Sequence, residues 1–185
     1  PFVAKQLIQR LVTSNPTPAY VGRVAAAFAD NGTGVRGDLK AVLRAILLDG
    51  EARDGGNSSD SAYGKVREPV VRFLNWARAF NAASAGDGWG VGDLSDPAAR
   101  LGQSPMRSGS VFNFFRPGYV PPNTSISAAS LAAPEMQITT ESSVAGYVNF
   151  MQRAVSGSAI GDTHADYSSL VPLAADSAAL LAEIN

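Results

Sequence analysis

The sequence contains no cysteine and only one histidine, His164, which excludes several kinds of chemistry. Without cysteine there can be no disulfide, no thiolate metal ligand and no cysteine nucleophile. The lack of cysteine is compatible with an oxidising and with a reducing compartment. A Ser-His-Asp triad would have to use His164, and the sequence has no G-x-S-x-G elbow to hold the serine.

Charged residues are also scarce, at 17% of 185 residues, compared with about 25% in an average soluble protein. The 15 lysines and arginines are balanced by 16 acidic residues, and no run of five or more basic residues occurs. A phosphate backbone needs a positive surface, so we expect no nucleic-acid partner. No apolar run reaches the roughly 18 residues that span a bilayer, so we expect no membrane span.

Apolar residues at helical spacing predict three amphipathic helices in the first 50 residues. The first covers Pro1 to Ser14, and the second begins at the N-cap Thr17 with Pro18 in its first turn. The third is capped by Asp38. It carries the strongest apolar face of the sequence, which we expect to be buried: Leu39, Val42, Leu43, Ile46 and Leu47.

The later part of the chain alternates predicted helices with Gly/Ser/Pro-rich loops. We expect loops at 54–64 and 84–92, and the following helices: one from Glu68-Pro69, a short one at 94–101, a long one at 134–155 and a terminal one at 174–184. No strand pattern of useful length is present. The predicted fold is therefore mainly α, an irregular helical domain with little or no β, and residues 1–185 are expected to form a single domain.

Aromatic residues gather in the segment 110–122, SVFNFFRPGYVPP. Phe112, Phe114, Phe115 and Tyr119 lie within eight residues, and the prolines that follow cannot continue a helix. Each aromatic side chain buries on the order of 150 to 250 Å². We interpret the segment as a structural plug beneath neighbouring helices. The alternative is a binding platform on which a ligand or a glycan stacks.

Carboxylates beside His164 form the best metal candidate, because Asp162 and Asp166 would share its side of an extended segment. A catalytic zinc site usually takes three protein ligands including imidazole, so this pattern without a second histidine favours a solvated loop and no metal. Asp54, Asn57 and Asp60, like Asp87, Asp93 and Asp96, are spaced for turns rather than for a calcium loop. No cofactor is expected, and no catalytic residue is assigned.

Two other groups of charged residues are candidates, one for glycosidase chemistry and one for an ion pair. Glu135 and Glu141 could perform glycosidase chemistry only if they faced each other across a cleft at about 5 to 9 Å. Glu68 and Arg72 have the spacing of an ion pair at a helix end, with Lys65 and Arg67 beside them. We favour the structural interpretation for this second group.

Five motifs in order resemble one protein family. They are FVAKQLIQRLVTSNPTPAYVGRVAAAF at 2–28, GDLKAVLRAILLDGEAR at 37–53, GKVREPVVR at 64–72, SVFNFFRPGYVPP at 110–122 and APEMQI at 133–138. Together they are similar to the C-terminal part of the bacterial family known as domain of unknown function 1800 (DUF1800). The resemblance covers most of the chain.

The resemblance implies an exported protein, in the periplasm, at the cell surface or secreted, whose N-terminal portion is absent here. It implies as partners that missing portion and another exported protein encoded nearby, and it supplies no catalytic residues. We therefore expect a non-catalytic helical module for assembly or binding. The alternative is the C-terminal part of a secreted hydrolase that acts on polymers, with its catalytic groups in the missing portion.

Overall fold

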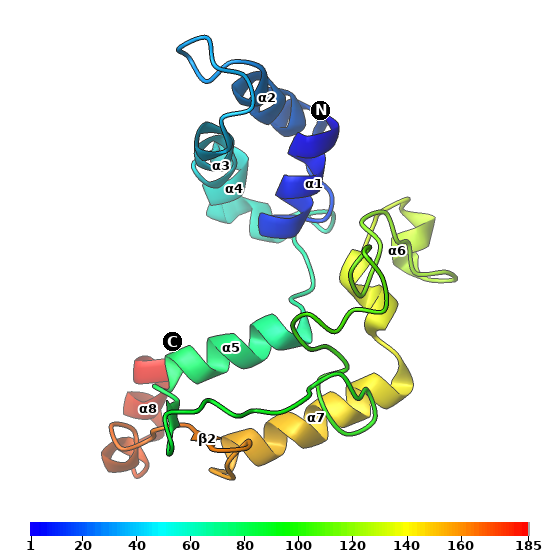
Figure 1. Cartoon of the computed structure of the whole chain (residues 1–185). Helices are drawn as coiled ribbons and strands as arrows, with labels where there is room; N and C mark the ends of the chain where they lie inside the picture. Colours follow the sequence, from blue (N-terminus) through cyan, green and yellow to red (C-terminus); the bar gives the residue numbers. More distant parts are fainter. Residues whose placement is uncertain (185) are drawn as a thin grey trace. The chain divides into compact units, whose positions relative to one another are not determined.

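The computed structural model describes residues 1–184 and is mainly helical, which confirms the predicted fold class (Figure 1). The chain forms two compact units, each built from two separate stretches. Unit 1 comprises Pro1–Val66 and Phe112–Ile138, and unit 2 comprises Arg67–Val111 and the chain from Thr139 onward. Within residues 1–184, no helix combines the length and the apolar character that crossing a membrane requires.

Unit 1 contains the predicted N-terminal helices and several short elements. Its elements are α1 (Phe2–Leu11), α2 (Pro18–Ala29), α3 (Leu39–Leu47), α4 (Gly50–Arg53), the 3-10 helix η1 (Gly55–Ser59), α6 (Ser125–Ala128) and the 3-10 helix η2 (Pro134–Ile138).

Side-chain caps start the second and third helices where the sequence predicts them. The Thr17 hydroxyl accepts a hydrogen bond from the Tyr20 amide at 3.1 Å, and Pro18 opens α2. The Asp38 carboxylate accepts hydrogen bonds from the amides of Lys40 and Ala41 at 3.0 and 3.2 Å. These caps satisfy amides that have no partner inside the helix, so each helix begins at a defined residue.

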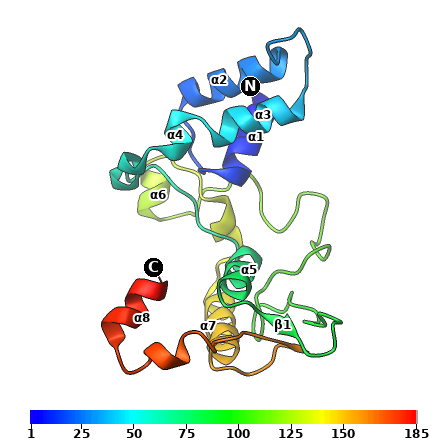
Figure 2. The ribbon, with the colours of Figure 1, turned by 90° about the vertical axis from the view of Figure 1, so that its left-hand side faces the viewer.

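The core of unit 1 lies where α1, α2 and α3 meet (Figure 2). Tyr20, at its centre, donates a hydrogen bond from its hydroxyl to the carbonyl of Ile46 at 2.7 Å, so its one polar atom is satisfied. The buried side chains are Ala4, Ile8, Tyr20, Val24, Val42 and Ile46.

The apolar face predicted for the third helix is only partly buried. Val42 and Ile46 are fully buried, but Leu39, Leu43 and Leu47 are 56%, 40% and 51% exposed. Successive helical residues turn by about 100°, so the five residues cover an arc too wide for α1 and α2 to enclose. The prediction that Leu43 is a core residue is therefore wrong.

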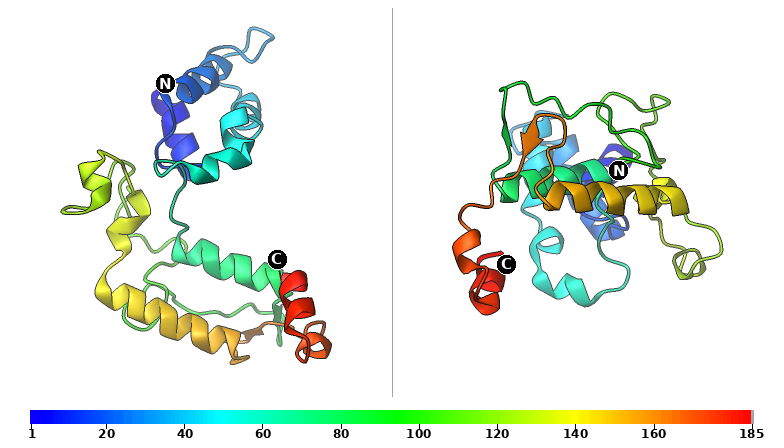
Figure 3. Two further views of the ribbon diagram at one scale, coloured as in Figure 1. Left: turned by 180° about the vertical axis from the view of Figure 1, so that it is seen from behind. Right: turned by 90° about the horizontal axis from the view of Figure 1, so that it is seen from below.

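Unit 2 is built around α5 (Pro69–Ala79) and α7 (Glu141–Val155), which lie alongside each other (Figure 3). Aromatic side chains join them, with the Phe73 ring 5.5 Å from both the Trp76 and the Phe150 rings, measured between centroids. Leu94 and Leu101 from the connecting chain complete this core. The other elements are β1 (Ala83–Ser84), β2 (Thr163–His164), the 3-10 helix η3 (Val171–Leu173) and α8 (Ser177–Ile184).

Three predicted segments differ from the structure. The helix expected at 134–155 is divided into η2 and α7, because Thr140 and Ser143 form a capping box that starts a new helix. The segment 94–101 makes a turn instead of a helix, with the Ala98 amide bonded to the Asp96 carboxylate. The loop at 54–64 contains η1, which Asp54 caps.

Gly146 in α7 allows the connecting chain to pass close to the helix. A Cβ atom added at Gly146 would lie 2.8 Å from the carbonyl carbon of Ala98, closer than real Cβ atoms come. We expect Gly146→Ala to lower the free energy of unfolding by about 1 to 3 kcal/mol. Gly22→Ala in α2, where the added atom meets nothing within 4 Å, should instead stabilise by about 0.5 to 1 kcal/mol.

Urea denaturation followed by far-ultraviolet circular dichroism measures both glycine variants. Similar effects of the two substitutions would show that the packing of α7 against residue 98 is not tight.

Arg23 and Asp49 link α2 to α4. The guanidinium Nε and Nη2 atoms donate to the two carboxylate oxygens at 2.7 Å each, and the same carboxylate caps α4 at the Glu51 amide. The hydrogen bond from Arg23 holds the pKa of Asp49 below its usual value, although burial opposes this effect. Asp49 therefore stabilises the fold above the unfolded pKa, near 3.9, and this contribution disappears as the pH falls through the folded pKa.

We expect Asp49→Asn to be less stable than the wild type at pH 6, and the difference to shrink steadily below about pH 4. Asparagine can still cap α4, which isolates the effect of the charge. Thermal unfolding of both proteins between pH 3 and pH 6 measures the difference. A difference that does not change with pH would contradict the assignment.

Candidate functional site

The four aromatic residues of the segment 110–122 lie in different environments. Phe115 is 2% exposed, and the Arg10 guanidinium carbon lies 4.6 Å from its ring centroid. Phe114 and Tyr119 are half-buried, whereas Phe112 is 72% exposed. The structural plug is therefore formed by Phe115 within unit 1. The binding role considered for these residues stays a prediction.

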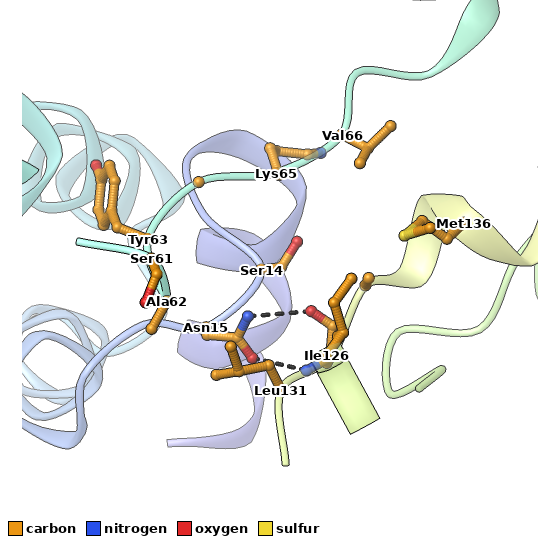
Figure 4. Close-up of a pocket in the computed structure, with 13 residues that line it drawn as sticks. Ser14, Asn15, Ser61, Ala62, Tyr63, Lys65, Val66, Ile126, Leu131 and Met136 are labelled. Atoms are coloured by element: carbon orange, nitrogen blue, oxygen red, sulfur yellow. Dashed lines mark hydrogen bonds between the residues drawn. The ribbon is translucent and has the colours of Figure 1, made fainter. Parts of the chain in front are cut away.

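A pocket of about 200 Å³ opens in unit 1 (Figure 4). Three stretches of chain line it: the turn after α1, the segment leading out of η1, and the segment from α6 to η2. In Figure 4, Lys65 lies above Ser14 and Asn15, while Ile126 and Leu131 lie below them. The lining residues are Ser14, Asn15, Ser61, Ala62, Tyr63, Gly64, Lys65, Val66, Ile126, Leu131, Ala132, Ala133 and Met136.

Asn15 fixes one wall of the pocket by binding a residue 117 positions away in the chain. Its amide nitrogen donates to the Ala132 carbonyl at 3.0 Å, and its amide oxygen accepts from the Ala132 amide at 2.9 Å, as the dashed lines in Figure 4 show. The side-chain amide thus pairs with both backbone polar groups of one residue, because it offers one donor and one acceptor side by side.

Thr13 and Ser14 hold the opposite wall. The Ser14 amide donates to the Gly64 carbonyl at 2.9 Å, and the Thr13 hydroxyl accepts from the Gly64 amide at 2.9 Å. The buried Gln9 side chain stabilises the turn after α1, since its amide nitrogen donates to the Ser14 carbonyl at 2.8 Å. Buried backbone groups are costly to leave unsatisfied, so these hydrogen bonds fix the shape of the pocket wall.

Lys65 lines the pocket and forms a buried ion pair with Glu135. The distance from Nζ to Oε1 is 2.8 Å, and the two side chains are 15% and 2% exposed. The same ammonium donates to the Arg10 carbonyl at the end of α1, at 3.0 Å. A lysine ammonium has three N–H groups, and these contacts account for two of them within the described residues.

Tyr63 is among the lining residues, and its hydroxyl points away from Ser14 and Ile126 in Figure 4. Burial raises its pKa, and the negative charge of Glu51 raises the pKa further. The hydroxyl is therefore neutral at physiological pH, so it can form hydrogen bonds but does not act as a base. The pocket as a whole combines an apolar wall with a few fixed polar groups, which is the usual composition of a ligand site.

The acidic residues beside His164 do not come together as a metal site. Asp162 accepts hydrogen bonds from the Ser84 hydroxyl and the Gly90 amide at 2.6 Å each, and these bonds lower its pKa. Asp166 accepts from the Ser168 amide, and His164 is exposed in β2. In the described part of the chain, no three His, Asp or Glu side chains are placed to share a metal ion.

The turn-forming aspartates act as the sequence predicts. Asp54, Asp60 and Asp93 each accept a hydrogen bond from the amide two residues later, at 2.8 to 2.9 Å. Such turns satisfy the backbone where the chain changes direction.

The two carboxylates that glycosidase chemistry would need belong to different units. Glu135 belongs to unit 1 and pairs with Lys65, while Glu141 lies in unit 2, exposed in the first turn of α7. Glu68 accepts a hydrogen bond from Gln103, and the Arg72 guanidinium lies 4.0 Å from the Tyr147 ring centroid.

These observations define a helical protein of two compact units, with a small pocket in unit 1. The model of the DUF1800 family, described as a protein of unknown function, matches residues 1–183, so the chain belongs to this family. No curated protein matches the chain. No solved structure matches it either.

We expect unit 1 to lose stability when one partner of the buried ion pair is removed, and to lose far less when both are replaced. Lys65→Ala leaves the Glu135 carboxylate buried without its ammonium, so it should lower the free energy of unfolding by about 3 to 5 kcal/mol. The double variant Lys65→Met, Glu135→Leu removes both charges and should recover most of that loss. Urea denaturation measures both. A Lys65→Ala protein within 1 kcal/mol of the wild type, roughly the effect of an exposed pair, would contradict this expectation.

Proposed function

We propose that this chain is a non-catalytic binding module whose pocket in unit 1 accepts one branched apolar side chain of a peptide, together with a carbonyl oxygen next to it. The observation that carries this proposal is the position of Lys65. Its ammonium is fixed by Glu135 and Arg10 at an otherwise largely apolar pocket, and one N–H group remains for a ligand.

The size of the pocket supports a side chain rather than a larger ligand. Sites for drug-sized molecules and cofactors occupy about 300 to 1,000 Å³. The pocket in unit 1 has only about 200 Å³, and Ile126, Leu131 and Met136 supply apolar walls. Branched aliphatic side chains such as those of leucine and valine match this lining.

The charge balance of the site favours a neutral acceptor. Glu135 already offsets the charge of Lys65, so a carboxylate would bring an uncompensated charge into a poorly solvated pocket. A peptide carbonyl accepts a hydrogen bond from the remaining N–H without that cost.

We further propose an exported location and assembly with other exported chains, including an N-terminal portion of the same protein. That part of the proposal rests on the family resemblance.

N-acetyl-leucine methylamide tests the pocket as a minimal ligand. We expect it to shift the amide resonances of Gly64 and Ala132 in a two-dimensional NMR titration, and N-acetyl-glycine methylamide to bind about tenfold more weakly or not at all. Ala62→Leu places additional side-chain volume at a lining residue and should abolish binding. Ala26→Leu on the exposed side of α2 is the matched control and should leave binding unchanged.

Two results would overturn the proposed function. One is unchanged binding of the leucine ligand to Ala62→Leu, and the other is equal binding of the leucine and glycine compounds. Circular dichroism of each variant confirms that the fold is retained.

A further inference from the structure

The surface of α3 carries an exposed row of leucines, which we name the leucine stripe: Leu39, Leu43 and Leu47. Residues four apart in a helix lie on the same side, one turn above another. The three side chains are 56%, 40% and 51% exposed, although Val42 and Ile46 on the neighbouring side of the same helix are fully buried. The stripe is thus an outward continuation of the core of unit 1.

Two cations border the leucine stripe on its outer side. Lys40 and Arg44 each follow a stripe residue by one position, which places them about 100° further around the helix. Both are exposed. The core of unit 1 therefore bounds the stripe on one side, and a pair of positive charges one turn apart bounds it on the other.

We propose that the leucine stripe docks an amphipathic helix of a partner, with apolar residues at i, i+3 or i+4 and i+7 and acidic residues along one edge. Helical partners are read by apolar side chains at this spacing. Glutamate or aspartate beside the apolar row of the partner would meet Lys40 and Arg44, and complementary charges of this kind select the partner and fix its register. This surface is separate from the pocket, and the proposal does not depend on the pocket's ligand.

Two other occupants fit the surface less well. A second copy of the chain paired through α3 would bring Lys40 and Arg44 close to the same two cations, and like charges facing each other oppose that contact. A membrane surface is usually bound by a helix with a broad apolar face and many cations. The leucine stripe covers only about 80° of the helix and has two cations at its edge.

Two synthetic helical peptides with one fluorescent label test the proposal. Both carry the same leucine row, but one has glutamates along the edge and the other has lysines. By fluorescence anisotropy with the whole chain, we expect the glutamate-edged peptide to bind at least about tenfold more tightly, and its affinity to fall as salt is added.

Variants of α3 make the assignment specific. Leu43→Ser should abolish binding of the glutamate-edged peptide. The double variant Lys40→Glu, Arg44→Glu should reverse the preference, so that the lysine-edged peptide binds more tightly. Val148→Ser on α7 is the matched control, because Val148 is a 54% exposed apolar residue of unit 2, and it should change neither affinity.

Several outcomes would overturn the proposal. Equal affinity for the two peptides, or unchanged binding by Leu43→Ser, shows that the leucine stripe does not select an acidic helix. Vesicles of anionic phospholipid that bind the wild type but not Leu43→Ser assign the stripe to a membrane. Light scattering that shows self-association, lost in Leu43→Ser, assigns it to a second copy. All substituted side chains are exposed, so circular dichroism should show an unchanged fold in every variant.

Discussion

The buried pair of Lys65 and Glu135 constrains unit 1, because neither charge can be left buried without the other at low cost. It connects the end of α1, the segment after η1 and the 3-10 helix η2, because the ammonium binds both the Arg10 carbonyl and the Glu135 carboxylate. Removing two charges from water costs several kcal/mol for each ion, and only close contact between them recovers that cost. The pair therefore stabilises the fold only while all three segments stay in place, and the same requirement fixes the position of Lys65 in the pocket lining.

Both units combine an apolar core with polar side chains that join distant segments. In unit 1, polar side chains join distant segments, as Asn15 does with Ala132 and Thr13 does with Gly64. In unit 2, aromatic packing around Phe73 joins α5 and α7, and the Asp162 carboxylate accepts hydrogen bonds from Ser84 and Gly90.

Local signals in the sequence predicted where α2 and α3 start but not where α7 starts. Thr17 and Asp38 act as caps through side chains that bind amides two or three residues later, so the sequence alone identifies them. The cap at Thr140 lies inside the segment 134–155, which the sequence analysis predicts as one long helix. The S/T-x-x-E/Q signature was no guide, since serine replaces the acid or amide at the fourth position.

By itself, the sequence determined the mainly helical class, the positions of most helices and the resemblance to DUF1800, because periodicity, caps and motif order are local properties of the chain. Only the tertiary structure decided which apolar residues are buried and which polar residues meet. Leu43 and Val42 are neighbours in one apolar pattern, yet just one is covered, since burial depends on how far α1 and α2 reach around α3. Lys65 and Glu135 are far apart in the chain, and no spacing rule links them. Their contact exists because folding brings the ends of separate segments to one place.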